Sequence, residues 1–262
     1  MRRGTLFWGL IFILAGILLL LDNLGIIAIS VWGVIWSVLL IALGFWILWG
    51  VVFKSSQTGE EIAIPLEGAR RGRIRVNHGG GRLSLDAAVD SEDLVAGTFV
   101  GGLDPRVRRS GDTLDVDLSV EPQTFFWAGP FSGGYNWTFG LNPTIPLSID
   151  MNTGAGEAQV DLSGLQVEDF RLKTGASSTR LTLPAHAGFT QASIESGAAS
   201  TDVFVPEGVA ARIRVESGLA SINIDRNRFP KEAGVFQSPD FASAENKVDL
   251  IIKTGVGAVS VR

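Results

Sequence analysis

The sequence predicts an all-β soluble domain of the single-stranded β-helix, or solenoid, type, preceded by an N-terminal hairpin of two transmembrane helices. Three observations predict this fold. A glycine-centred phrase recurs at a nearly constant spacing, apolar residues alternate on both sides of each glycine, and two long segments near the N-terminus carry no charge. With 262 residues, the chain is long enough to hold both parts.

The two uncharged segments come first in the chain, at residues 5–21 and 31–53. At 1.5 Å per residue they give helices of roughly 25 and 34 Å, which suffices to cross a hydrocarbon core of about 30 Å. The sequence Asp22-Asn23-Leu24-Gly25 separates them. Residues 1–54 are therefore expected to form a two-helix anchor and residues 55–59 a linker. A cleaved signal peptide is disfavoured, because no small-residue cleavage site precedes the second segment.

The repeated sequence motif consists of Ser or Thr, then Gly, then two small or apolar residues, then a segment with the pattern of a strand. It occurs five times after residue 146, and its first four glycines are 21, 22 and 21 residues apart. Such a period is typical of rungs that stack on one another. Glycine suits the corner of a rung, because it adopts a left-handed backbone without a Cβ clash and lets neighbours approach closely. The five glycines are Gly154, Gly175, Gly197, Gly218 and Gly255.

Apolar residues, with threonine in two places, lie five and three positions before each glycine and four and six positions after it. In the first of these rungs they are Ile149, Met151, Ala158 and Val160. The period of two predicts a strand on each side of the corner, with one face turned inward. We therefore expect a β-solenoid over residues 147–262.

The region before the solenoid, residues 60–146, is expected to be an N-terminal β-region that contributes a first rung around Gly79. Its Arg70, Arg71, Arg73 and Arg75 are either a contact for anionic headgroups or one solvated face of a strand. An excursion within this region is rich in aromatic rings. It forms either a tip that contacts a membrane or partner, or a hairpin that caps the open end of the stack. The rings are Phe125, Phe126, Trp127, Phe131, Tyr135, Trp137 and Phe139.

No catalytic, cofactor-binding or metal-binding residues are predicted, and we expect neither an enzyme nor a small-molecule substrate. The chain has no cysteine and two histidines, His78 and His186, and neither histidine has a second ligand at metal spacing. Gly154-Ala155-Gly156 lacks the Lys-Ser/Thr of a phosphate-binding loop. After residue 53, 20 basic and 26 acidic side chains give an acidic body, which disfavours a nucleic-acid partner.

Two stretches of sequence resemble a known bacterial family. Residues 2–17, RRGTLFWGLIFILAGI, and residues 20–25, LLDNLG, are similar to the LiaF-type transmembrane region. Residues 141–147, LNPTIPL, together with TGAGE from residue 153 and VDL from residue 160, resemble the toast-rack β-domain that is joined to such regions. The chain is thus identified as a member of the LiaF-like, cell-wall-active antibiotics response family.

This resemblance implies a protein of the bacterial cell membrane that acts in the envelope-stress response through protein–protein interaction, without a cofactor. Some family members restrain a two-component sensor kinase. The implied partners are therefore the lipid bilayer and a membrane signalling protein. The alternative is self-association into an oligomeric scaffold of the bactofilin-like or adhesin-like β-helix type. The strand at Val259-Ser260-Val261 bears on this choice, because a bare last strand either pairs with another chain or is covered by the inserts.

The basic residues that flank the expected hairpin predict its orientation. Arg2, Arg3 and Lys54 lie on one side of it, whereas the connection over residues 22–30 has no Lys or Arg. Basic residues near membrane ends stay in the cytoplasm. We therefore expect a multi-pass protein with two helices and a cytoplasmic β-domain.

Overall fold

The computed structural model describes residues 36, 39–41, 59–87, 92–120 and 135–262. The chain divides into two compact units, Met1–Lys54 and Ser55–Arg262. Residues 36 and 39–41 are helical, and the two expected membrane helices otherwise lie outside the described residues. Within the described part of the chain, no helix has the length and apolar character needed to cross a membrane.

The second unit is an all-β domain, as the sequence predicts. Its short strands include β11 (Lys231–Glu232) and β12 (Val235–Gln237). The other strands are β1 (Glu60–Pro65), β2 (Arg71–Asp86), β3 (Asp93–Val100), β4 (Asp104–Ser110), β5 (Thr113–Ser119), β6 (Tyr135–Leu141), β7 (Pro146–Asp161), β8 (Gln166–Thr182), β9 (Phe189–Phe204), β10 (Ala210–Ile224) and β13 (Lys247–Val261).

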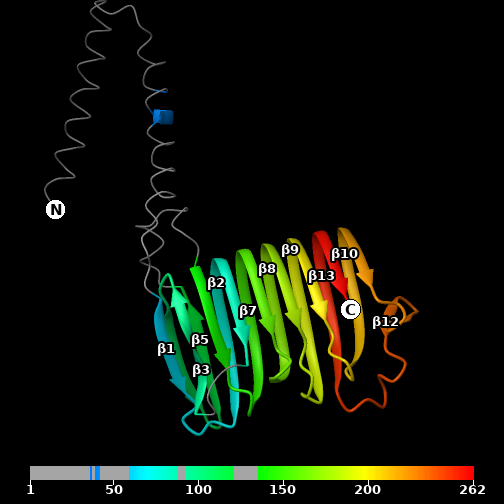
Figure 1. Ribbon diagram of the computed structural model, residues 1–262, viewed down its shortest axis with the longest axis horizontal. Helices are drawn as coiled ribbons and strands as arrows, with labels where there is room; N and C mark the ends of the chain where they lie inside the picture. Colours follow the sequence, from blue (N-terminus) through cyan, green and yellow to red (C-terminus); the bar gives the residue numbers. More distant parts are fainter. Residues whose placement is uncertain (1–35, 37–38, 42–58, 88–91, 121–134) are drawn as a thin grey trace, which may run out of the picture. The chain divides into compact units, whose positions relative to one another are not determined.

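Six long strands form the body of this unit, and they lie side by side in the order β2-β7-β8-β9-β13-β10 (Figure 1). Neighbouring strands are parallel, and their glycine corners align. The order corrects the expectation that each rung stacks on the next in the sequence. The last strand, β13, lies between β9 and β10.

Each long strand changes its inward face at the glycine corner. In β7, Ile149 and Met151 are buried before the corner, and Ala158 and Val160 are buried after it. In β7 the buried positions are therefore odd-numbered before the corner and even-numbered after it, so the inward face shifts by one residue. The shift takes place at Gly154, since Thr153 and Ala155 pair with β8 whereas the glycine between them does not. This pattern confirms the predicted alternation in β7, and both halves of each long strand contribute to one apolar core. In β10 the prediction is wrong for Ile222, which the alternation places inward and which is exposed because β10 ends the stack.

The sheet divides at the end of the stack next to β2. The first half of β2 pairs with β5, which pairs in turn with β4, whereas the second half pairs with β6. From β6, the sheet continues through antiparallel pairs to β3 and β1. Trp137 and Phe139, from the aromatic region of the sequence, are buried in the core at this end and pack against Phe99. Phe125, Phe126, Trp127 and Phe131 lie outside the described residues.

The other end of the stack is β10, and the insert between β10 and β13 covers it in part. Strand β12 pairs with Arg212 and Ile213, in the first half of β10. Phe229 and Phe236 of the insert are buried there. The second half, residues 217–224, pairs with β13 on one side and with no described strand on the other. The bare final strand that the sequence suggested is therefore not at an end. Instead, β10 presents the open edge.

Candidate functional site

A column of glycines crosses all six rungs at the corners, and at every one of them except Gly79 a side chain would press on the backbone of a neighbouring rung. A Cβ added to Gly154 would lie 2.0 Å from the carbonyl oxygen of Gly79, and one added to Gly175 would lie 2.8 Å from that of Gly154. In three rungs a positive φ angle occurs two residues later, at Gly81, Gly156 and Gly257, and none occurs in the column. The column glycines are thus explained by close approach between rungs, and the expected left-handed backbone belongs to the later position.

A groove of about 1140 Å³ runs along this column. Each rung contributes the glycine, the residue before it and the polar residue two positions before it. The residue before the glycine is Ser or Thr in five rungs and His78 in β2. The residues two positions before it are, in the order of the strands, Asn77, Asn152, Lys173, Glu195, Lys253 and Glu216.

Opposite charges alternate along this polar row. The Nζ of Lys173 lies 3.4 Å from the carboxylate of Glu195, and the Nζ of Lys253 lies 3.4 Å from that of Glu216. Stacking in sequence order would instead place Glu195 beside Glu216, and like charges directly opposite destabilise a strand pair. The alternation therefore favours the observed place of β13, and it leaves this side of the groove neutral.

Hydroxyl groups form the second row of the groove. Ser196 donates a hydrogen bond to Thr254 across neighbouring rungs, with 2.9 Å between the oxygens. Thr153 has a buried hydroxyl with no hydrogen-bond partner among the described residues. This neutral, polar surface can bind an extended polar chain through hydrogen bonds, but it brings together no nucleophile with a base.

His78 begins this row, and its surroundings are those of a core residue. The residue is 3% exposed, and its ring lies edge-on to Trp137 with the ring centroids 5.0 Å apart. Its Nε2 is 3.2 Å from the carbonyl oxygen of Tyr135. Burial lowers the pKa of His78, an effect that this hydrogen bond partly opposes. Across the described part of the chain, no group of His, Cys, Asp or Glu is arranged to hold a metal ion.

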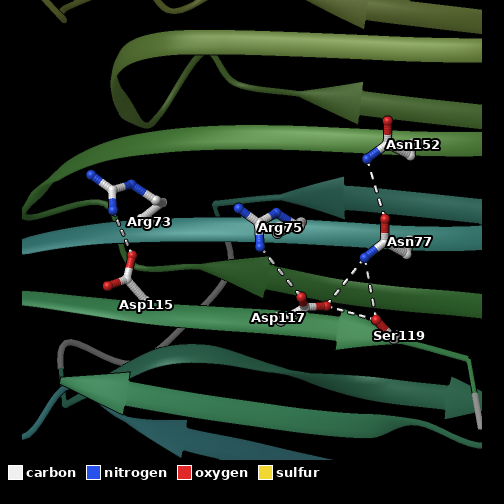
Figure 2. Close-up of polar contacts among 7 residues, drawn as sticks. All are labelled: Arg73, Arg75, Asn77, Asp115, Asp117, Ser119 and Asn152. Carbon is white, nitrogen blue, oxygen red and sulfur yellow. Dashed lines mark hydrogen bonds and ion pairs between the residues drawn. The ribbon is translucent and has the colours of Figure 1, made fainter.

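The four arginines that the sequence singled out lie at the start of β2 and just before it. Arg71 pairs with Glu168, Arg73 with Asp115 and Arg75 with Asp117, at 3.1, 2.9 and 3.6 Å. Figure 2 shows the last two pairs on neighbouring strands β2 and β5, beside the amide contacts of Asn77. The sequence did not predict these pairs, because nothing local placed β5 next to β2 or Glu168 of β8 near the start of β2.

The open edge of β10 is the second surface of functional interest. Edges such as β1 and β4 contain charged residues and proline, for example Glu60 in β1 and Pro105 in β4, and such residues discourage another strand from pairing. By contrast, residues 217–224 of β10 read SGLASINI and contain neither charge nor proline. Leu219 is 82% exposed and Ile222 is 39% exposed. An exposed apolar edge with free backbone groups is a template for a partner strand.

Comparison with known families gives two matches. Residues 53–204 match the N-terminal domain of toast_rack, DUF2154, and residues 6–48 match the LiaI-LiaF-like transmembrane region. No curated protein matches the chain.

Two solved structures are similar to this chain. One is a candidate cell adhesion protein from Clostridium sporogenes, with a TM-score of 0.70 and 21% identity over 78% of this chain and 97% of that one. The other is a candidate adhesin from Bacteroides fragilis, with a TM-score of 0.31 and 10% identity over 80% of this chain and 99% of that one. At 21% identity the first match shows a shared fold and nothing more. The TM-score of the second is too low to show even a shared fold.

Proposed function

Because this chain belongs to the family of the toast_rack N-terminal domain, and its first segment matches the LiaI-LiaF-like transmembrane region, we propose that it is a non-enzymatic interaction module of the bacterial envelope-stress response. The membrane region attaches the β-solenoid to the bilayer. The solenoid then binds a membrane signalling protein, such as a two-component sensor kinase, that responds to cell-wall antibiotics.

The open edge of β10 is the observation that carries this proposal. Strand addition uses backbone hydrogen bonds for affinity and side chains such as Leu219 and Ile222 for specificity. The insert covers the first half of β10 and leaves the second half accessible. A domain with no use for this edge would be expected to protect it with charge or proline, as β1 and β4 do.

An oligomeric scaffold is the second candidate function, and the fold shared with a candidate cell adhesion protein supports it. Head-to-tail stacking of solenoids needs two bare ends. At the β2 end, the outer strands β1 and β4 contain proline and charged residues. This difference between the two ends favours a different protein as the partner over an open chain of copies.

We further propose that the solenoid faces the cytoplasm. The support is the placement of Arg2, Arg3 and Lys54 on one side of the two uncharged segments. In that position, the edge of β10 can reach the cytoplasmic parts of a sensor kinase.

Affinity capture of the intact protein from crosslinked membranes tests the proposed function. Wild type should retain a membrane signalling protein, whereas Leu219→Lys and Ser221→Lys should lose it, because charge on an edge strand opposes pairing. Phe204→Lys is the matched control, since Phe204 is also an exposed apolar residue but lies on a strand with neighbours on both sides.

The outcomes separate the two candidates. Equal retention by Leu219→Lys and wild type would contradict the proposed use of this edge. Capture of the chain's own copies, with no other protein, would replace the signalling proposal with the scaffold.

A further inference from the structure

A second hollow, of about 380 Å³, lies on the outer face of strands β4, β5 and β2. The pairing of these strands places its charged residues in two rows, each with an aspartate between two arginines. The rows are Arg73–Asp115–Arg108 and Arg75–Asp117–Arg106.

The charges in this hollow do not cancel, since four guanidinium groups and two carboxylates line it and the carboxylate of Asp104 beside it adds only a third negative charge. Arg73 contacts Asp115 at 2.9 Å through one of its nitrogens. Arg106 contacts Asp104 at 3.0 Å. Arg108, although opposite Asp115 in the pairing, makes no ion pair or side-chain hydrogen bond with any described residue.

We propose that this hollow binds a phosphoryl group. Each guanidinium has five N–H donors in a planar fork, and the single contacts seen here leave most of them unused. Such forks match the oxygens of a phosphate, and clusters of arginine are a recurring means of recognising phosphorylated groups. Exposed ion pairs contribute little free energy, so the arginines can exchange a carboxylate for a ligand at small cost.

The surroundings make this positive hollow distinct. The chain after residue 53 carries six more acidic than basic side chains, so the excess of arginine here does not follow from composition. The phosphoryl group belongs either to the headgroup of an anionic phospholipid or to a soluble phosphate. This binding goes beyond the proposed function and uses the end of the stack opposite to the edge of β10.

Binding measurements on the full chain test this proposal. The protein is placed in nanodiscs of phosphatidylcholine and titrated with inorganic pyrophosphate by calorimetry. A parallel sample in nanodiscs that contain photoactivatable phosphatidylglycerol reports lipid contact by crosslinking. Saturable binding of pyrophosphate with little lipid crosslinking identifies a soluble ligand. Lipid crosslinking that pyrophosphate displaces identifies a headgroup site.

Two variants show whether the hollow is responsible. Arg108→Gln should weaken binding about tenfold, the loss expected for one hydrogen bond to a charged group. Arg180→Gln should leave binding unchanged, since Arg180 is also exposed, lies opposite an aspartate in its pairing and makes no ion pair with a described residue. Thermal unfolding confirms that both variants are folded.

Two results would overturn the proposal. One is the absence of both saturable pyrophosphate binding and lipid crosslinking in the wild type. The other is an equal loss in Arg108→Gln and Arg180→Gln, which would mean general attraction to positive charge. Either result would leave the arginines of β4 with the single role of discouraging edge pairing, and neither would affect the capture experiment at Leu219.

Discussion

Alanine substitutions along the glycine column test how the rungs stack, because the space available for an added Cβ differs from one glycine to the next. A Cβ at Gly154 would lie 2.0 Å from the nearest carbonyl oxygen, and one at Gly175 would lie 2.8 Å away. At Gly79, the first of the column, the nearest atom is a Tyr135 ring carbon at 3.9 Å. The rungs must therefore separate for the first two substitutions and need not move for the third.

The structure sets the expected magnitudes. A carbon–oxygen contact normally needs about 3.3 Å, so Gly154→Ala lacks more than an ångström and Gly175→Ala lacks about half of one. Overpacking typically costs about 1–3 kcal/mol. We expect a loss near the top of this range, about 3 kcal/mol, for Gly154→Ala, and a loss of about 1 kcal/mol for Gly175→Ala. Gly79→Ala should be neutral, or stabilising by up to about 0.5 kcal/mol, because alanine restricts the unfolded chain.

Urea unfolding of the full-length protein in detergent, followed by the circular dichroism of the β-structure, measures these free energies. The predicted order of stability is Gly79→Ala, then Gly175→Ala, then Gly154→Ala. Equal losses at Gly79 and Gly154 would contradict the role assigned to close approach between rungs. They would mean that the glycines are needed for local backbone geometry instead.

Three further predictions follow from the core and the anchor. Leu181→Asp buries an unpaired charge and should lower the unfolding free energy by several kcal/mol. Leu219→Asp, at an exposed position, should change it by less than about 0.5 kcal/mol. Similar losses in the two variants would contradict the assigned core. Burial lowers the pKa of His78, so the unfolded chain binds a proton on this side chain more readily than the folded chain does. The free energy of unfolding should therefore decline as the pH falls below about 6.5, the ordinary pKa of histidine. His78→Gln should reduce that decline in a Tm series, and an unchanged decline would mean that other groups cause it. Alkaline phosphatase fused after Arg262 should be inactive and a fluorescent protein fused there should be bright, and the reverse would place the solenoid outside the cytoplasm.

The sequence was sufficient to predict the rungs, because their signals are local. A two-residue alternation identifies the inward face of a strand, and the regular glycines mark the corners. Both signals hold at Ile149 and Met151, which are buried as predicted. They do not depend on which rung lies next to which.

The order of the rungs could not be read from these local signals, because parallel strands with the same register can pair with any neighbour. Two features of the sequence do bear on the order. The distance from Gly218 to Gly255 breaks the period, which allows the chain to cross over β10. The charges of Glu195, Glu216 and Lys253 alternate only when β13 lies between β9 and β10.

Both candidate surfaces depend on this long-range pairing, and for that reason the sequence predicted neither in full, although it singled out Arg73 and Arg75 as a candidate contact for anionic headgroups. The open edge of β10 exists because β13 inserts before it. The arginine hollow exists because β5 and β4 extend the first half of β2. In the sequence, Arg108 and Arg73 are separated by the whole of β3, and nothing local indicates that they face one hollow.

Site-specific photocrosslinking in intact cells shows whether this membrane-attached solenoid acts through the open edge of β10. A photoreactive amino acid is placed at Leu219 in one variant and at Phe204 in another. We expect a crosslinked product with a membrane signalling protein from Leu219 and none from Phe204. The same products from both positions, or products that contain only copies of this chain, would contradict this expectation.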